Sequence, residues 1–183
     1  MIFELGELSG EPAGERPDLL APTTADAIAV RGLGSRLGVV EIDPEVSDTA
    51  ASQKAFGLPP DALANCVVVG GKREGQERIA ACLILATTKA DVNNAVRRLL
   101  DVRKASFLAM ERAVELTGME YGGITPIGLP PDWPVFVDRA VTDRPLLVIG
   151  SGVRRSKLLA PGQVLGSLPG AQVVDGLGLA VSS

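Results

Sequence analysis

The segment NCVVVGGKREGQERIAACLILATT, residues 65–88, carries the clearest structural signal in the chain. Two β-rich runs flank the polar segment KREGQE, which contains a glycine, and this pattern predicts a β-hairpin. The second run is apolar on both alternating faces, which is typical of a strand inside a sheet that is covered on both sides. A turn centred near Glu74 would place Cys66 and Cys82 opposite each other.

Shorter helix and strand signals surround the hairpin and alternate irregularly. Apolar periodicity and capping residues predict helices at 24–30, 47–57, 91–101, 110–118 and 161–168. β-rich runs predict further strands at 37–43, 105–109, 134–138, 145–150 and 156–160. Thr24 is the expected N-cap of the first helix, and Ser47 or Asp48 that of the second. Because some strands form hairpins and others are separated by helices, we expect a mixed sheet and the α/β (α+β) class.

The length of 183 residues is sufficient for one domain with a core of its own. Residues 1–22 are acidic with interspersed Gly and Pro, and we expect a loosely ordered N-terminal segment there, followed by a single domain at 23–183. No apolar run approaches the roughly 18 residues that span a bilayer, and the first residues lack the basic-then-apolar order of a signal peptide. These features predict a cytoplasmic protein without a membrane partner.

The absence of histidine excludes several classes of site. It removes the usual general base, the usual zinc ligand and every Ser-His or Cys-His dyad. The two cysteines, Cys66 and Cys82, are too few for a metal site, and in a reducing compartment they are expected to remain thiols that pack as small apolar side chains. We therefore predict neither a metal nor a cofactor.

The formal net charge of -4 is unevenly distributed. Residues 1–50 carry three basic and ten acidic side chains, whereas residues 51–183 carry fifteen basic and twelve acidic ones. Three basic clusters stand out: Arg97 with Arg98, Arg103 with Lys104, and the segment RRSK at 154–157. If they converge on one face they can contact phosphates, and if they are scattered they are ordinary solvated charges.

A second notable segment is GMEYGGITPIGLPPDWPVFVD, residues 118–138, which is rich in glycine and proline. These residues fix the backbone in conformations that others reach only with strain, so the loop can present amide groups to a ligand. The alternative is an ordinary tight connection between a helix and an edge strand.

The order of these motifs resembles a known family. A hairpin, a helix, a helix ending in LTG, the loop GGITPIG, the strand PVFVD, and then VIGSG with LLAPGQVL are similar to the YbaK/EbsC family over about residues 26–168. Members are aminoacyl-tRNA editing domains related to the insertion domain of bacterial prolyl-tRNA synthetases. The resemblance implies a mixed, partly curled β-sheet surrounded by helices, and aminoacyl-tRNA as the partner. A homodimer is left open.

The resemblance also implies an activity, hydrolysis of the ester that joins a wrong small amino acid to tRNA. The chemistry is compatible with a chain lacking histidine, because the ester is already activated and a vicinal ribose hydroxyl or a bound water can attack it. The protein then has to position the carbonyl, limit the size of the pocket and supply donors for the developing oxyanion.

The matching positions define the expected site. The expected catalytic residues are Asn65, Gly122, Gly123 and Asp138. The expected substrate-binding residues are Ile124, Thr125, Pro126, Gly128, Gly150, Ser151 and Gly152. The expected tRNA phosphate contacts are Arg154, Arg155 and Lys157. For Asp138 a turn-capping role is the alternative, and Ser151 has no base that would activate it.

One position departs from the family pattern. Relatives begin the first hairpin strand with a lysine that is central to activity, and this chain has Asn65 there. Asparagine keeps hydrogen-bonding capacity but lacks the positive charge. Lys72, Lys89 and Lys157 are candidates to supply a cation from elsewhere, but the sequence places none of them in the pocket.

Three functions therefore remain open. The first is a freestanding hydrolase that removes a small amino acid from mischarged tRNA. The second is a non-hydrolytic module that binds an aminoacyl-tRNA end, an amino acid or an aminoacyl adenylate. The third is a different small-molecule or protein-interaction role on the same scaffold, because a fold does not fix a function.

Overall fold

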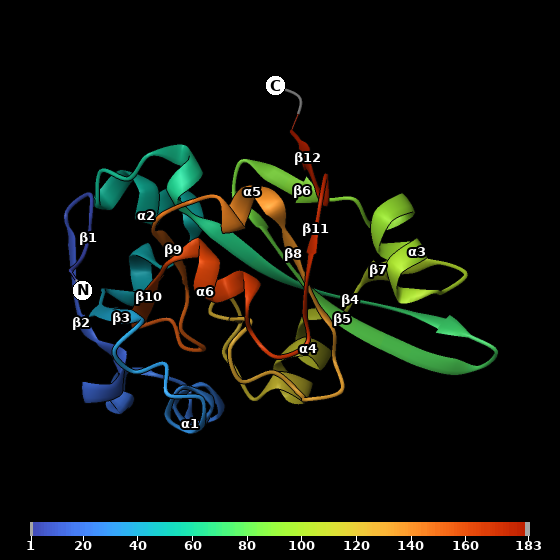
Figure 1. The fold of residues 1–183 in the computed structure, drawn as a ribbon, viewed down its shortest axis with the longest axis horizontal. Coiled ribbons are helices and arrows are strands. Elements are labelled where there is room, and N and C mark those ends of the chain that lie inside the picture. The colour runs from blue at the N-terminus through green and yellow to red at the C-terminus, as the bar shows by residue number, and fades with distance from the viewer. Residues whose placement is uncertain (1, 182–183) are drawn as a thin grey trace.

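The computed structural model describes residues 2–181, which form two five-stranded sheets, a two-stranded ribbon and surrounding helices (Figure 1). The strands are β1 (Phe3–Leu5), β2 (Leu8–Pro12), β3 (Gly38–Glu41), β4 (Ala64–Arg73), β5 (Gln76–Leu85), β6 (Thr88–Ala90), β7 (Ala105–Phe107), β8 (Val135–Asp138), β9 (Leu147–Gly150), β10 (Ser156–Ala160), β11 (Ala171–Val174) and β12 (Gly178–Ala180). The α-helices are α1 (Pro22–Val30), α2 (Thr49–Ala55), α3 (Arg97–Leu100), α4 (Met110–Thr117), α5 (Arg139–Thr142) and α6 (Gly162–Gly166). A π-helical turn, Val92–Val96, leads into α3.

The two large sheets differ in strand direction. The first has the order β1-β2-β3-β10-β9 and is antiparallel throughout. The second has the order β11-β8-β5-β4-β7, in which β8 runs parallel to both of its neighbours. A single bridge between Leu63 and Val148 connects the β4 side of one sheet to β9 of the other. The expected α/β class with a mixed, curled sheet is confirmed.

The β4–β5 hairpin is present, but its register differs from the expected one. Glu74 and Gly75 both have left-handed φ values, 51° and 79°, and form a two-residue turn. Cys66 therefore pairs with Leu83, one residue away from the expected partner. Since a shift of one residue moves a side chain to the opposite face, Cys66 and Cys82 lie on opposite sides of the sheet and do not face each other.

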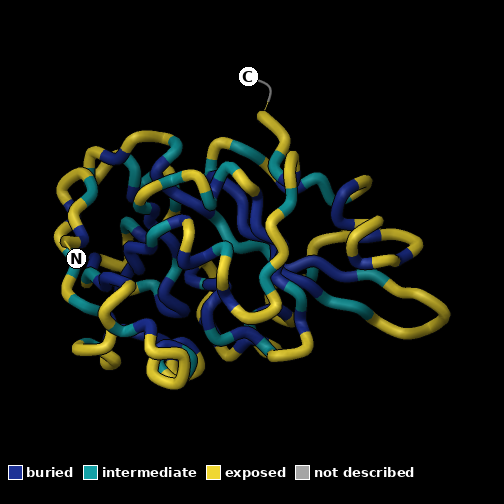
Figure 2. Tube along the Cα trace, viewed as in Figure 1, coloured by how far each residue is buried: buried dark blue, intermediate teal, exposed yellow. Residues whose placement is uncertain are grey.

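Strand β5 is buried on both faces, as its apolar sequence predicts. Ala81, Leu83 and Leu85 pack into the core that also holds side chains of the first sheet. Cys82 and Ile84 pack on the other side, against residues around α3. Figure 2 shows this buried centre and the exposed tip of the β4–β5 hairpin projecting from it. No helix among residues 2–181 is long and apolar enough to cross a membrane.

Most of the sequence-derived helix ends agree with the structure. Gly118 ends α4 with φ 69°, which is the conformation expected of a C-terminal glycine. Asp48 occupies the N-cap position of α2. Thr24 is not the N-cap of α1, because that helix already starts at Pro22, two residues earlier, and Thr24 is fully buried inside it.

The N-terminal segment is more ordered than its composition predicts. Within residues 2–22, β1 and β2 form a hairpin that extends the first sheet through pairing of β2 with β3. Phe3 and Leu8 are each 3% exposed. Phe3 packs directly over Gly38, where a Cβ atom would lie 2.5 Å from the phenyl ring. Burial of these alternate residues, with the acidic side chains between them outside, explains why an acidic segment forms strands.

Candidate functional site

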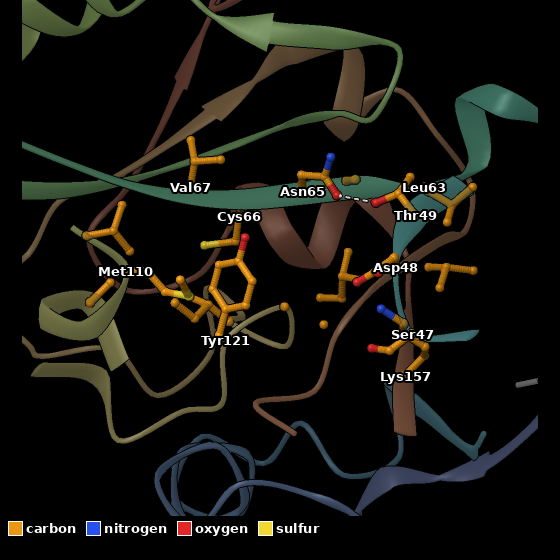
Figure 3. A pocket seen from close by; sticks show the side chains of 18 of the residues that line it. Ser47, Asp48, Thr49, Leu63, Asn65, Cys66, Val67, Met110, Tyr121 and Lys157 are labelled. Atoms are coloured by element: carbon orange, nitrogen blue, oxygen red, sulfur yellow. Dashed lines mark hydrogen bonds between the residues drawn. The ribbon is translucent and has the colours of Figure 1, made fainter. Parts of the chain in front are cut away.

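A cavity of about 500 Å³ opens between β4 and β9 (Figure 3). The start of α2, the segment around β7 and α4, and the loop after α4 complete its wall. Its lining residues are Ser47, Asp48, Thr49, Leu63, Ala64, Asn65, Cys66, Val67, Val68, Phe107, Leu108, Met110, Ala113, Tyr121, Gly122, Ile124, Val148, Ile149, Gly150 and Lys157. Of the expected site residues, the structure brings together Asn65, Gly122, Ile124, Gly150 and Lys157 here.

Asn65 is held in a defined orientation within this cavity. The Thr49 hydroxyl donates a 3.0 Å hydrogen bond to the Asn65 side-chain oxygen. This bond uses the acceptor end of the amide, and the amide nitrogen has no hydrogen-bond partner among the described residues. Asn65 therefore keeps an N–H donor without a partner among the described residues at the edge of the cavity.

Lys157 supplies a positive charge to the same cavity from β10. Its side chain lies beside Asp48 at the polar end (Figure 3) and the residue is only 7% exposed. Burial, together with the nearby Arg154 cation, lowers the pKa of Lys157 to about 8, and Asp48 opposes the shift. The sequence predicts a tRNA phosphate contact for Lys157, and the structure places this residue in the lining of the cavity.

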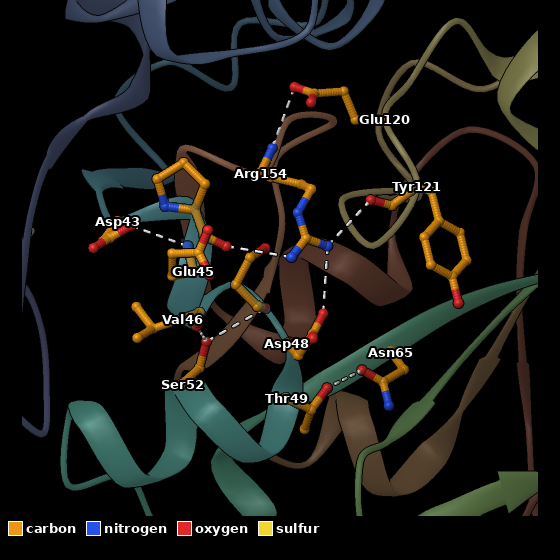
Figure 4. A network of polar contacts seen from close by, with 12 residues as sticks. Asp43, Glu45, Val46, Asp48, Thr49, Ser52, Asn65, Glu120, Tyr121 and Arg154 are labelled. Carbon is orange, nitrogen blue, oxygen red and sulfur yellow. Dashed lines mark hydrogen bonds and ion pairs between the residues drawn. The ribbon is translucent and has the colours of Figure 1, made fainter.

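Arg154 fixes the wall beside Lys157 (Figure 4). Its guanidinium group donates to the Pro44 carbonyl at 3.3 Å and to the Tyr121 carbonyl at 3.5 Å, and it pairs with Asp48 at 3.3 Å. Gly122 makes room for it, because a Cβ atom there would lie 2.4 Å from a guanidinium nitrogen. Arg154 thus connects the segment before α2 to the loop after α4.

The mouth of the cavity is apolar and exposed. Phe107 is 57% exposed, Met110 48% and Tyr121 59%. Cys66 lies deeper, and burial raises the pKa of its thiol well above the usual range. The thiol stays protonated near neutral pH, so Cys66 is a lining group and not a nucleophile.

Several expected binding glycines serve close packing between loops. Gly123 accepts a 2.7 Å hydrogen bond from the Gly152 amide. A Cβ atom at Gly150 would lie 2.6 Å from the Gly123 carbonyl oxygen, and one at Gly152 would lie 2.3 Å from the Ala21 side chain. Gly128 has φ +96° and abuts the backbone of Thr23. The glycines thus allow the loop to pack tightly against the β9–β10 turn and α1, and Gly150 also lines the cavity.

Other expected residues lie outside the cavity lining. Asp138 is 4% exposed; its carboxylate accepts from the Ala140 amide at the start of α5 and from the Gly178 amide. Ser151 is fully buried, and its hydroxyl lies within hydrogen-bonding distance of two carbonyl acceptors, those of Val153 and Ser156. The structure therefore gives Asp138 the capping role that sequence left as its alternative. The buried Thr125, together with Pro126, also lies outside the lining.

Arg155 is exposed, but its side chain contacts the backbone of the chain itself. Its guanidinium group donates to the carbonyl of Asp18. Arg97 and Arg98 donate to carbonyls of their own helical segment, those of Asn93 and Asn94. None of these three arginines lines the cavity. No group of three potential metal-binding side chains occurs among residues 2–181.

Comparison with known proteins identifies the family. The model for the aminoacyl-tRNA editing domain matches residues 43–165, two thirds of the chain. The chain belongs to the aminoacyl-tRNA editing domain family. The resemblance to YbaK/EbsC proteins is thereby confirmed. The matched region contains both Asn65 and Lys157, so the whole polar end of the cavity lies within the editing domain.

Solved structures share the fold of this editing domain. A candidate trans-editing enzyme for prolyl tRNA synthetase is 26% identical with a TM-score of 0.71, over 85% of this chain and 94% of that one. A scaffold protein from an epitope-grafting design study is 24% identical with a TM-score of 0.72, covering 88% and 97% of the two chains. A hypothetical protein at 20% identity has a TM-score of 0.75 and coverage of 86% and 99%. Comparison with curated proteins gives no match.

Sequence reasoning did not find several of the groups that line the site. Thr49, Asp48 and the exposed aromatic residues of the mouth have no motif that sets them apart. Lys157 had a usable signal, because it is the one charged residue in SKLLA, a strand whose five residues are all buried. A lysine in a fully buried strand has to reach a cavity or a charge partner, because an unpaired buried charge is costly.

Proposed function

We propose that this editing domain is a freestanding deacylase that hydrolyses the ester of a small amino acid mischarged on tRNA. The observation that carries the proposal is the buried Lys157 ammonium group in the same cavity as the oriented Asn65 amide. A cation and a fixed N–H donor in a partly dry site are the groups that stabilise an oxyanion. Family membership supports an aminoacyl-tRNA substrate.

In this mechanism the ester carbonyl lies between Lys157 and Asn65. The attacking oxygen is that of a water, since burial raises the pKa of Cys66 and keeps it a thiol. The water loses a proton as it adds to the carbonyl, and the ribose oxygen takes up a proton as its bond to the acyl carbon breaks; the vicinal ribose hydroxyl can relay that proton. As negative charge develops on the carbonyl oxygen, the ammonium group and the amide N–H stabilise it. With a pKa of about 8, Lys157 is about nine-tenths charged at pH 7.

The same groups explain how the chain can act without the lysine of its relatives. Asn65 stands at the lysine position on β4, and Lys157 brings a positive charge into the cavity from β10 instead. The cation is thus supplied from a different strand of the fold. Asp48 helps to keep it charged, because its carboxylate opposes the lowering of the lysine pKa.

The second candidate is a non-hydrolytic module that binds an aminoacyl end. The same donors bind a carbonyl oxygen or carboxylate in the ground state, and the cavity lining contains no histidine. Binding without turnover would favour this function.

The test is a deacylation assay on a panel of charged tRNAs with a blank without enzyme. The panel contains alanine and cysteine on proline tRNA, and serine or alanine on noncognate tRNAs. Selective loss of one mischarged species is expected. No loss above the blank, with measurable binding of the charged end, would transfer the assignment to the binding module.

A matched pair of variants tests the donor role. Asn65→Asp keeps the size of the side chain and a group that accepts from Thr49, but it replaces the N–H donor with an acceptor. Deacylation should fall by about 100-fold or more, the usual cost of losing one oxyanion donor. Asn93→Asp, on an exposed helical turn outside the cavity, makes the same chemical change and should leave the rate unaltered.

A further inference from the structure

A basic groove adjoins the cavity on the side of the β4–β5 hairpin. Its charged lining residues are Lys72, Glu77, Arg103, Lys104 and Arg112. Arg112 forms a two-point ion pair with Glu77. The other three cations, Lys72, Arg103 and Lys104, have no ion-pair partner among residues 2–181. Three unpaired positive charges therefore gather on a chain whose net charge is -4.

The groove continues directly from the catalytic cavity. Phe107 and Leu108 line both. Strand β4 also runs along both, with Asn65 in the cavity and Lys72 in the groove. Seven residues of extended strand place these two positions about 23 Å apart. A ligand with its reactive end in the cavity can thus follow one strand to the three unpaired cations.

The exposed aromatic ring of Phe107 lies where the cavity and the groove meet. The chain has only six aromatic residues. The two that are more than half exposed, Phe107 at 57% and Tyr121 at 59%, both line the mouth of the cavity. Exposed rings in a chain this poor in aromatics call for a partner with a flat apolar face. Aromatic rings beside a positively charged groove are the arrangement that binds single-stranded nucleic acid.

We propose that this groove binds the single-stranded 3′ end of tRNA and the backbone that follows it. A base stacks on Phe107, and phosphates contact Lys72, Arg103 and Lys104. The proposal rests on the proposed function, because it takes the aminoacyl ester to lie in the cavity at the other end of β4. It assigns the tRNA contact to this groove and not to the turn at 154–157.

The experiment compares two charge reversals in RNA binding. Arg103→Glu with Lys104→Glu alters the groove, and Arg31→Glu with Arg36→Glu alters exposed positions near α1, at the other end of the molecule (Figure 1). Uncharged tRNA is titrated by fluorescence anisotropy at several salt concentrations. The groove variant should bind at least about tenfold more weakly, and its salt dependence should fall by about 1.4 in log–log slope, since two contacts to a single strand are lost. The control variant should match the wild type.

Phe107→Ala separates stacking from charge. Binding should weaken by about 5- to 100-fold with the salt slope unchanged, because stacking contributes no counterion release. Equal binding by wild type and groove variant, or no binding of tRNA by the wild type at 50 mM salt, would overturn the groove assignment.

Deacylation kinetics distinguish failure of the groove from failure of the proposed function. If both proposals hold, the groove variant raises KM and leaves kcat unchanged at saturation. Deacylation with an unaltered KM in the groove variant overturns the groove and keeps the function. Groove-dependent tRNA binding by a protein that deacylates nothing supports the groove and removes the hydrolase.

Discussion

The turn at 154–157 and the groove beside β7 both carry clustered cations, but the fold uses them differently. Arg154 and Arg155 donate hydrogen bonds to carbonyl groups of the chain. Lys157 lies in the cavity wall and is only 7% exposed. Arg103 and Lys104 are exposed and lack ion-pair partners among the described residues. A basic cluster in a sequence therefore predicts only where positive charge is dense, and the hydrogen bonds and ion pairs of each cation decide whether it is available to a ligand.

The two basic regions also differ in the free energy that it costs the fold to keep each lysine charged. An exposed lysine such as Lys104 keeps its hydration, so its charge costs the fold little. Lys157 loses most of its hydration, which is why its pKa falls to about 8. A destabilising buried cation at the wall of the cavity marks Lys157 as a candidate functional residue.

Replacing Lys157 should give the largest effect, with opposite signs on activity and stability. In Lys157→Met deacylation should fall by about 100-fold or more, because the oxyanion loses its cation. The free energy of unfolding at pH 7 should rise by about 1 to 3 kcal/mol, because a pKa lowered from 10.5 to about 8 measures the cost of burying the charge. Urea unfolding and single-turnover deacylation measure the two quantities. A loss of stability in this variant would show that Lys157 is held for structure, and Lys104→Met is the exposed control.

The pH dependence of activity should follow the same group. The charged lysine is required, so the enzymatic rate, after subtraction of spontaneous ester hydrolysis, should fall about tenfold per pH unit above about pH 8. Stability should move the other way: the folded state binds fewer protons than the unfolded state between about pH 8 and 10.5, so the free energy of unfolding rises with pH across that window. A rate that rises through pH 8 would instead identify neutral Lys157 as a general base.

The sequence predicted what is encoded locally and missed what depends on distant partners. The hairpin, Gly118 at the end of α4 and Asp48 at the start of α2 follow from residues close in the chain. Strands β1 and β2 were missed because their stability comes from packing on a sheet formed by residues beyond 37. The predicted pairing of Cys66 with Cys82 was wrong by one residue, because the strand register depends on the turn conformation at Glu74 and Gly75.

The site shows the same division between local and distant information. The family resemblance led to Asn65 and to the loop residues Gly122 and Ile124, which do line the cavity. It led to Lys157 as a tRNA phosphate contact and a candidate cation but did not place it in the cavity, because Lys157 lies 92 positions after Asn65 in the chain and comes near it only where the two sheets meet. Asp138 was selected from the end of a strand motif, where the position alone does not distinguish a helix cap from a catalytic acid.

The smallest effects are expected for the two arginines of the turn, and they test the comparison from its other side. Arg154→Gln removes contacts to Pro44, Tyr121 and Asp48, so the free energy of unfolding should fall by about 1 kcal/mol and KM should rise severalfold as the cavity wall loosens. Arg155→Gln removes one exposed contact to Asp18 and should change stability by less than about 0.5 kcal/mol.

Neither substitution should alter the salt slope of tRNA binding, because in this structure both guanidinium groups are directed to the chain. A slope reduced by about 0.7 in Arg155→Gln would mean that this exposed cation leaves Asp18 for a phosphate when tRNA binds. The two basic regions would then form one extended RNA surface around the cavity, and the distinction between structural and available cations would hold only for Lys157 and Arg154. An unchanged slope in both variants, beside a reduced slope in the groove variant, would confine the RNA to the β4–β7 side of the molecule.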